Sequence, residues 1–429
     1  MNPDSDPNVD ADERLPLKGV RVIDFSWIVA GPQATRILAD FGAEVIRVEY
    51  KGRVDSIRIG MTSPPADPSS PNGSGMFNNL NRNKLSATAN LNHPQGLDLI
   101  RRLIAVSDAV VENFSSRVME QRGLSYEAMA AVNPGIIYLS LSGFGHSGRD
   151  RDYVTWGPTA QALSGLTRMS GLPDAPPAGW GFSYLDHTAG YYGAAALLLA
   201  LYERSRSGCG QYIDIAQIET GMVLAGPAIL DYCVNGRPYI RPGSPPGNHL
   251  VYPVVAPHNT YRCRPDPRRD VPDDSWVAIA VFRDDEWRAL CHVMGDPDWC
   301  HEERLATNNG RIEHQRDLDA KISTWTSTLD RYDVMYLCQA GGVAAGVVQD
   351  AADRTERDPQ LAARAFYPEI EHSELGLHRF EGLPFRGSRL LWSLRRAAPR
   401  LGEDTSYVLR DLLGLSDVEI ECLDEEAAI

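Results

Sequence analysis

The sequence that decides the fold begins with Val20-Arg-Val-Ile-Asp-Phe25 and ends with Glu44-Val-Ile-Arg-Val48. Both ends of this stretch are short runs of β-branched residues, which predict buried strands. Between them, Pro32 suits the first turn of a helix that we expect to reach about Phe41, and Gly42 ends it. A strand, a crossover helix and a second strand form a βαβ unit, so the stretch predicts a parallel sheet.

The same alternation continues further along the chain. Apolar runs and amphipathic runs alternate as expected strands and helices over 85–91, 97–107, 109–114, 126–132 and 136–141. We therefore expect an α/β fold that binds its ligand at the carboxyl ends of the strands. Glu49 stands where dinucleotide-binding proteins place a ribose-binding acid, but no G-x-G-x-x-G motif precedes it, so Glu49 alone does not indicate such a site.

Length and charge limit the classes of function. The chain has 429 residues and a net charge of −15. Its length suggests two domains, or one domain with an insertion. The negative charge argues against binding along a nucleic-acid backbone, but it is compatible with a phosphorylated ligand held in a local basic pocket.

Cysteine usage and polarity indicate the compartment. The seven cysteines are odd in number and not closely paired, which predicts free thiols in a reducing environment. Cys291-His292 and Cys300-His301 do not follow a standard zinc spacing, so we expect no metal site. No uncharged apolar run is long enough to span a membrane, and residues 1–14 are expected to be a polar, disordered lead-in rather than a signal peptide. Together these features predict a cytoplasmic enzyme.

Composition changes near Val234 and suggests how the domains are arranged. Residues 235–257 are rich in Pro, Gly, Arg and Tyr, and a strand over 276–281 and helices over 285–294 and 317–329 follow. We expect a large domain over 15–233, a smaller inserted α+β domain over 234–341, and a return to the large domain over 342–429.

A single acidic residue precedes the longest apolar run. Gly181-Phe-Ser-Tyr-Leu-Asp-His-Thr-Ala-Gly190 leads into a segment that predicts a buried helix from about Thr188 to about Arg206. Asp186 then lies at or just before the helix N-terminus. It could be an N-cap that accepts first-turn N–H groups. It could also be a carboxylate kept ionised by the helix dipole and available as a nucleophile, and spacing alone does not choose between the two.

Several phrases, in order from about Leu15 to the C-terminus, resemble the class III (CaiB/BaiF-type) CoA-transferase family. They are Leu17-Lys-Gly-Val-Arg-Val-Ile-Asp-Phe25 with Ala30-Gly-Pro32, Gly42-Ala-Glu-Val-Ile-Arg-Val-Glu49, Asn81-Arg-Asn-Lys84, Val111-Glu-Asn-Phe114, Asp186 with Gly190, Arg204-x-x-x-Gly208-Cys-Gly-Gln211 and Ala398-Pro-Arg-Leu-Gly-Glu403. The resemblance implies a Rossmann-like large domain built from both chain ends, a smaller inserted domain, and two chains interlocked as rings.

The resemblance also implies site residues. The family's catalytic carboxylate falls on Asp186, and its coenzyme A (CoA) contacts fall on Trp27, Ile28, Val29, Ala30, Lys84, Asn113 and Phe114. Family members often carry a basic residue directly after the second-strand Glu, whereas this chain has Tyr50 followed by Lys51. Either Tyr50 stacks on the adenine or Lys51 takes the basic role. CoA is then a substrate and product, and no tightly bound cofactor is expected.

The implied chemistry is CoA transfer through an aspartyl anhydride and an aspartyl-CoA thioester. The carboxylate must be unprotonated, so we expect a low pKa for Asp186 at the helix N-terminus. Because water would hydrolyse the anhydride, the loop Pro242–Asn248 is either a lid or a plain linker.

Two alternatives to the transferase remain open. An α-methylacyl-CoA racemase would need a second acid or base, but the matching position is Trp156, and His146 and His187 lie elsewhere. A non-catalytic subunit of a heteromeric transferase is the other alternative, and the retained Asp186 argues against it.

Aromatic residues are the one feature of the sequence that indicates which carboxylic acids are donor and acceptor. If two or more of them face the site, the acyl group is bulky or aromatic; they are Trp27, Trp156, Trp180, Tyr184, Tyr191 and Tyr192. We expect succinyl-CoA as donor and a benzylsuccinate-like acid as acceptor, with carnitine-like and small dicarboxylic acids as open alternatives. The chain would act as a homodimer or in a heteromer with a related subunit.

Overall fold

The computed structural model describes residues 14–60, 70–173, 175–238, 245–250, 252–267, 269, 271 and 273–429. These residues form two compact units. Unit 1 takes in the described residues up to Thr167, Gly179–Arg237 and Ala362–Ile429, and unit 2 takes in those of Arg168–Ala178 and Pro238–Leu361. The expected lead-in over 1–14 lies almost entirely outside the described residues, as do positions 242–244 of the expected lid.

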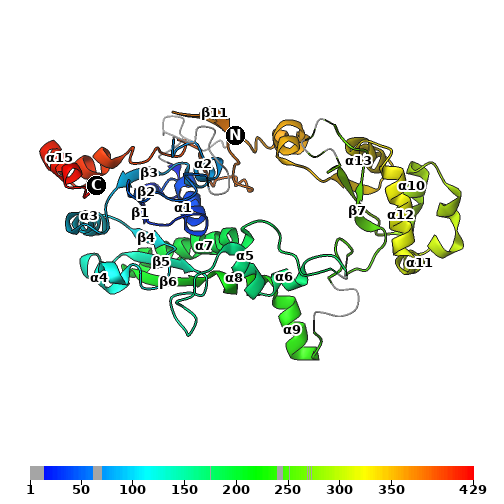
Figure 1. Cartoon of the computed structure of the whole chain (residues 1–429), viewed down its shortest axis with the longest axis horizontal. Coiled ribbons are helices and arrows are strands. Elements are labelled where there is room, and N and C mark those ends of the chain that lie inside the picture. Colours follow the sequence, from blue (N-terminus) through cyan, green and yellow to red (C-terminus); the bar gives the residue numbers. More distant parts are fainter. Residues whose placement is uncertain are drawn as a thin grey trace. The chain divides into compact units, whose positions relative to one another are not determined.

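The central element of unit 1 is a parallel sheet of six strands, as the α/β prediction requires (Figure 1). Its order is β3-β2-β1-β4-β5-β6, and every neighbouring pair is parallel. The strands are β1 (Arg21–Asp24), β2 (Glu44–Glu49), β3 (Leu85–Thr88), β4 (Ala109–Glu112), β5 (Ile137–Ser142) and β6 (Gln211–Ala216). The strand order reverses between β1 and β4, which is where doubly wound sheets form a ligand crevice.

Helices cover both faces of this sheet because each strand alternates its apolar side chains. Val22 and Val111 join the core cluster that contains α1 (Ala30–Asp40) and α7 (Tyr184–Ser207). Their neighbours Ile23 and Val110 face the other cluster, with α3 (Pro94–Ala105) and α4 (Tyr126–Val132). A strand buried on both faces is continuously apolar, which is why these runs could be recognised in the sequence.

One glycine allows α7 to approach α1 closely. A Cβ placed on Gly190 would lie 2.6 Å from the Cβ of Gln33, so no larger residue fits at this crossing. The remaining elements of unit 1 include α2 (Gly75–Asn81), α5 (Gly157–Leu163), α8 (Gln217–Leu224), α9 (Gly226–Asn235), the hairpin β10 (Glu369–His372) and β11 (Gly376–Arg379), and α15 (Asp417–Glu425).

Unit 2 has its own antiparallel sheet and helices. The sheet order is β7 (His258–Arg262), β8 (Trp276–Ala280), β9 (Ala344–Val347). Its helices include α10 (Asp284–Val293), α11 (Asn308–Glu313), α12 (Gln315–Thr326) and α13 (Arg331–Ala340), which share one core with the sheet. Because β9 pairs with β8, the chain returns to unit 1 at Ala362, whereas the return to the large domain was expected at 342.

Across the part of the chain that the structure describes, no helix has the length and apolar character needed to cross a membrane. Nor do the described residues contain a group of His, Cys, Asp and Glu side chains arranged to hold a metal ion.

Candidate active site

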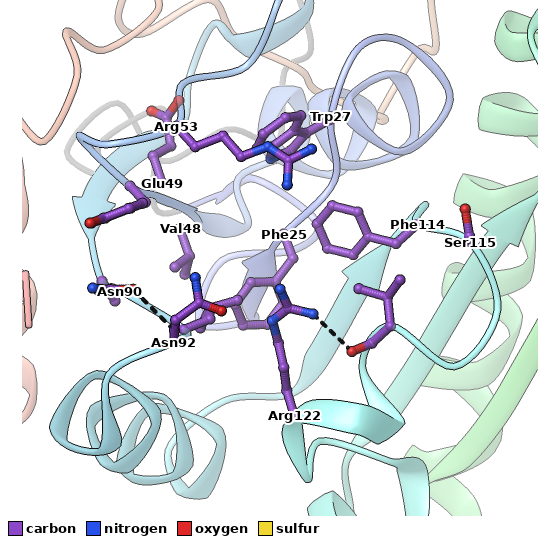
Figure 2. Close-up of a pocket in the computed structure, with 14 residues that line it drawn as sticks. Phe25, Trp27, Val48, Glu49, Arg53, Asn90, Asn92, Phe114, Ser115 and Arg122 are labelled. Carbon is purple, nitrogen blue, oxygen red and sulfur yellow. Dashed lines mark hydrogen bonds between the residues drawn. The ribbon is translucent and has the colours of Figure 1, made fainter.

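Two adjoining cavities lie at the carboxyl ends of the strands of unit 1. The first, the β2–β4 cavity, has a volume of about 360 Å³ and is lined by Phe25, Trp27, Val48, Glu49, Tyr50, Arg53, Ala89, Asn90, Leu91, Asn92, Phe114, Ser115, Val118 and Arg122 (Figure 2). The second, the Asp186 cavity, has a volume of about 310 Å³ and is lined by Trp27, Ile28, Val29, Arg53, Asn113, Phe114, Ser115, Leu141, Ser142, Gly143, Tyr153, Val154, Thr155, Trp156, Asp186 and Gln217. Four residues line both, so the cavities share a wall; they are Trp27, Arg53, Phe114 and Ser115.

Asp186 does not cap its helix. α7 begins at Tyr184, earlier than expected, and its N-cap is Ser183. Asp186 therefore lies in the first turn, and its Oδ1 accepts a hydrogen bond from Nε2 of Gln217 at 2.6 Å. The N-cap interpretation of Asp186 is wrong, and the carboxylate faces the cavity instead.

The expected low pKa of Asp186 is also wrong. Burial raises its pKa to about 6, and the hydrogen bond from Gln217 opposes this rise only in part. Desolvation thus outweighs the favourable helix dipole, because a carboxylate in a largely closed site loses most of its hydration. With a pKa near 6 the ionised form still exceeds the protonated form by about ten to one at pH 7.

A glycine makes room for the second oxygen of Asp186. Gly157 is the first residue of α5, and a Cβ added there would lie 2.3 Å from Oδ2 of Asp186. Any side chain at this position would push the carboxylate away. Trp156, the N-cap residue of α5, lines the same cavity.

The loop after β1 contributes Trp27, Ile28 and Val29 to the lining of the Asp186 cavity. The side-chain amide of Asn113 holds this loop: its Oδ1 accepts from the backbone N–H of Trp27 at 2.7 Å, and its Nδ2 donates to the Trp27 carbonyl at 2.8 Å. The ring of Phe114 meets that of Trp27 edge to face, with centroids 6.2 Å apart. Asn113 and Phe114 thus shape the loop as well as line the cavity.

Ile28 is strained. Its φ is 64°, in the left-handed region that a β-branched residue rarely adopts. The backbone N–H of Ile28 donates to Oδ2 of Asp55 at 3.0 Å, and the same oxygen accepts from Nη2 of Arg47 at 2.5 Å. Such strain persists only where the surroundings hold it, and it is concentrated at functional sites.

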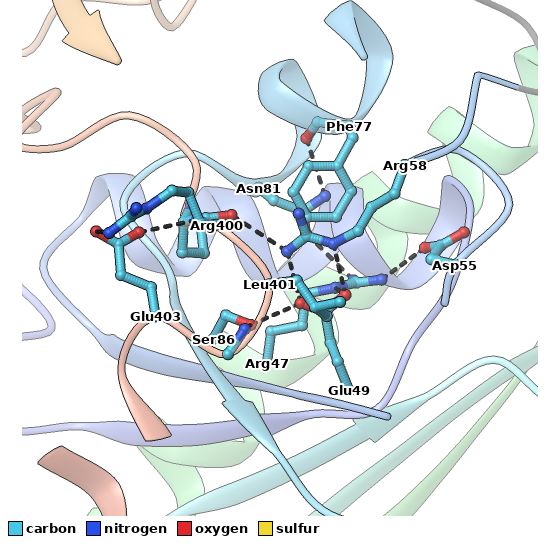
Figure 3. Close-up of polar contacts among 12 residues, drawn as sticks. Arg47, Glu49, Asp55, Arg58, Phe77, Asn81, Ser86, Arg400, Leu401 and Glu403 are labelled. Carbon is cyan, nitrogen blue, oxygen red and sulfur yellow. Dashed lines mark hydrogen bonds and ion pairs between the residues drawn. The ribbon is translucent and has the colours of Figure 1, made fainter. Parts of the chain in front are cut away.

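The Arg47–Asp55 pair belongs to a buried ionic cluster beneath the loop (Figure 3). Arg58 in this cluster donates to both oxygens of Glu49, at 2.8 and 2.6 Å, and its guanidinium lies 3.6 Å from the centre of the Phe77 ring. Glu49 lines the β2–β4 cavity, but its oxygens are already bound, which explains why it is a poor candidate for a ribose-binding acid.

Lys84 was expected to contact CoA and does not reach either cavity. Its side chain is completely buried, and its Nζ bonds Asp24 at 3.0 Å, Thr35 at 2.7 Å, Asn81 at 3.0 Å and the Pro32 carbonyl at 3.1 Å. These four acceptors account for its bonding capacity, so Lys84 stabilises the core beneath α1.

Of the remaining residues expected to contact CoA, some line a cavity and others do not. Tyr50 lines the β2–β4 cavity, whereas Lys51 is exposed, pairs with Asp424 at 2.8 Å and lines neither cavity. Ala30 is buried at the start of α1 and is not part of the lining, unlike Ile28 and Val29. Of the two alternatives for this position, Tyr50 is therefore the one that lies at a cavity.

Sequence reasoning missed Gln217, Gly157 and Arg53. Gln217 follows β6 directly, so the rule that ligands bind at the carboxyl ends of parallel strands could have indicated it. Arg53 lies over the Trp27 ring at 5.2 Å. No sequence signal marks Gly157 or Arg53 as a site residue.

The comparisons with known proteins identify the family. Residues 17–405 match the family model for CoA-transferase family III. The chain is 33% identical to succinyl-CoA–D-citramalate CoA-transferase of Chloroflexus aurantiacus, covering 96% of this chain and 98% of that protein. It is 32% identical to succinate–glutarate CoA-transferase of Agrobacterium fabrum, covering 92% and 96%.

Solved structures lead to the same family. The crystal structure of a CaiB/BaiF family protein from Brucella suis superposes with a TM-score of 0.82 and 30% identity, covering 92% of this chain and 99% of that one. The chain belongs to CoA-transferase family III and is a CoA-transferase. The family and the enzyme class predicted from the sequence are thereby confirmed.

Proposed function

We propose that the chain moves CoA from succinyl-CoA to a second dicarboxylic acid, with Asp186 as the nucleophile. The observation that carries this proposal is the position of Asp186, half-buried in a cavity and held by one amide, at the ligand edge of the sheet. The names of the relatives support the substrate class, since they use succinyl-CoA or succinate together with citramalate, malate or glutarate.

The two cavities suggest how CoA lies. The β2–β4 cavity, with Tyr50 for stacking and with Arg53 and Arg122 for phosphate, suits the nucleotide part (Figure 2). Nη1 of Arg122 donates to the Val118 carbonyl at 3.1 Å, and this bond holds the guanidinium in the cavity lining. The pantetheine arm would then pass the shared wall at Trp27 and Phe114 and place the thioester beside Asp186.

The reaction follows from this placement. The Asp186 carboxylate attacks the thioester carbonyl, the carbon–sulfur bond breaks, and the electron pair leaves on the CoA thiolate. The thiolate then attacks Cγ of Asp186, which releases succinate and leaves an aspartyl-CoA thioester. The acceptor acid reverses these steps and departs as its CoA ester.

The residues that line the Asp186 cavity indicate which acceptor acids could fit. Trp27, Trp156 and Tyr153 line it, and the other aromatic residues considered from the sequence do not; these are Trp180, Tyr184, Tyr191 and Tyr192. Two tryptophans and a tyrosine accommodate an apolar substituent, so an aryl-substituted succinate such as benzylsuccinate belongs in the acceptor panel with the simple dicarboxylates.

A second subunit completes the proposal. The helices α7, α8 and α9 expose large apolar side chains, for example Leu199 at 69%, Leu230 at 63% and Val234 at 70%. Many exposed apolar side chains on neighbouring helices are typical of a subunit interface. The proposal is therefore a dimer, either of two copies interlocked as rings or of this chain and a related subunit, as in the relatives named alpha and beta subunits of a malate CoA-transferase.

The racemase alternative has little support. The cavity presents Trp156 where a proton-transferring group would be needed, and His187 contacts Gln33 at 3.3 Å and does not line the cavity.

An acceptor screen tests the proposal. Purified protein is incubated with succinyl-CoA and, separately, glutarate, malate, citramalate and benzylsuccinate, and the CoA esters are measured by mass spectrometry. At least one new ester is expected from the wild type and none from Asp186→Ala. An active Asp186→Ala variant would refute the nucleophile, and activity with monocarboxylic acids alone would refute the substrate class.

A further inference from the structure

The carboxylate of Asp186 is hydrogen-bonded by a buried side chain, that of Gln217. It is the first residue of α8, directly after β6, and is 6% exposed. Its Nε2 donates to Oδ1 of Asp186 at 2.6 Å, and both residues line the same cavity. Gln217 thus touches one of the two oxygens that the proposed reaction uses.

The surroundings of the carboxylate distinguish its two oxygens. Oδ1 is bound by the Gln217 amide, whereas Oδ2 lies against the α-carbon of Gly157, where no side chain intervenes. A carboxylate oxygen that accepts a short hydrogen bond is the poorer nucleophile, so Oδ2 is the atom that should attack. Oδ1 then becomes the carbonyl oxygen of the anhydride and of the thioester.

The geometry points to Gln217 as a further catalytic residue, which stabilises the oxyanion that forms on Oδ1 of Asp186. This inference rests on the proposed function. When the CoA thiolate attacks Cγ, the Cγ–Oδ1 double bond opens and negative charge collects on Oδ1. The tetrahedral carbon then expels succinate, with Oδ2 and the electron pair of the Cγ–Oδ2 bond, and the double bond reforms.

The same event recurs in the second half of the reaction. The acceptor carboxylate attacks Cγ of the thioester, charge again collects on Oδ1, and the carbon–sulfur bond breaks with its electron pair on CoA. Gln217 would donate to Oδ1 in both intermediates from a position that is already fixed. Donors placed in advance where charge develops are among the strongest catalytic effects in enzymes.

Few charged or titratable groups line the cavity beside Asp186. Apart from Asp186, the charged or titratable residues that line the cavity are Arg53 and Tyr153. Burial is the larger influence on the pKa of Asp186, and the Gln217 hydrogen bond is the one contact that lowers it. Removal of that bond should therefore affect both catalysis and the pH at which Asp186 ionises.

The test compares two buried glutamines. Gln217→Met keeps the length of the side chain and removes the donor, and Gln161→Met is the matched control. Gln161 is 1% exposed on the neighbouring α5 and does not line the Asp186 cavity. We expect Gln217→Met to lower kcat about 100-fold, as for loss of one oxyanion donor, with KM for succinyl-CoA changed less than about threefold, and the control to remain near wild type.

The pH profile separates a catalytic role from a packing role. In wild type the acidic limb of kcat/KM should have its midpoint near pH 6, the pKa of Asp186. Gln217→Met should move that midpoint to higher pH, and Gln217→Glu should move it further because a second carboxylate then faces the first. A loss of packing alone would lower activity without moving the midpoint.

The outcomes are decisive for each claim. If the wild type transfers CoA and Gln217→Met keeps kcat within about threefold with an unmoved acidic limb, the inference about Gln217 fails and the proposed function stands. If Gln217→Met is unstable, Gln217→Leu decides in the same way, because it also removes the donor without adding a charge. If the wild type transfers CoA to no acid, the proposed function itself fails.

Discussion

The carboxylate of Asp55 accepts a hydrogen bond from the backbone N–H of Ile28 at 3.0 Å, and this bond holds Ile28 at a φ of 64°. Asp55 is itself fixed by Arg47 within the buried cluster. The strained residue belongs to a loop that lines the same cavity as Asp186. The position of that loop therefore depends on a side chain that does not line the site.

Asp55→Ala should lower kcat about tenfold or more, because the loop can then relax from a conformation that costs about 1–3 kcal/mol. Ile28→Gly in the same chain should restore part of the loss, since glycine adopts positive φ freely. Steady-state kinetics and thermal unfolding of the single and double variants provide the measurement. A double variant no more active than Asp55→Ala would show that Asp55 acts only through stability.

Gly157→Ala should reduce activity strongly and leave the fold intact. The added Cβ would lie 2.3 Å from Oδ2 of Asp186, so the carboxylate must move, and a displacement of about 1 Å can cost about 100-fold in rate. Gly226→Ala is the matched control: it also opens a helix before a proline, and a Cβ there meets nothing within 4 Å. Equal activity of the two variants would contradict the packing described for Asp186.

Asp186→Asn should stabilise the folded protein at neutral pH, by about 1–2 kcal/mol. The pKa of Asp186 is raised to about 6 in the fold, so its ionised form is disfavoured there relative to the unfolded chain. The penalty is absent well below about pH 4, where Asp186 is protonated in both states, and nearly complete above about pH 6. Unfolding measured by denaturant at about pH 3 and pH 7.5 should show the gain at pH 7.5 only, and an equal gain at both would argue against the raised pKa.

Lys84→Met should destabilise the fold without a specific loss of CoA affinity. Its removal leaves the buried Asp24 without its cation, which costs about 3–5 kcal/mol. The folded fraction should bind CoA with nearly the wild-type dissociation constant, measured by calorimetry at low temperature. A large loss of affinity with unchanged stability would restore Lys84 as a ligand contact.

The sheet could be predicted because its strands are buried on both faces. The β-branched runs of β1 and β2 can be recognised in the sequence whichever strands they pair with. The helix start at Pro32 and the helix end at Gly42 likewise depend only on local backbone conformation. Asp186 could be found because it precedes the longest apolar run. The family of the chain could be assigned only from several sequence phrases in order, and not from any single residue.

The details that failed depend on contacts between distant parts of the chain. The sequence around Lys84 is the same whether its side chain contacts a ligand or pairs with Asp24, a residue 60 positions away. The pKa of Asp186 depends on desolvation by α5 and the neighbouring loops, which no local pattern reveals. The role inferred for Gln217 likewise requires that the end of β6 meet the start of α7.

The most direct measurement concerns the covalent intermediate itself. The wild-type protein is incubated with succinyl-CoA without an acceptor, quenched with hydroxylamine, digested and analysed by mass spectrometry. The account predicts a hydroxamate on Asp186 and on no other residue, and its absence when succinyl-CoA is omitted. A hydroxamate on a different side chain, or none from a preparation that transfers CoA, would contradict the account.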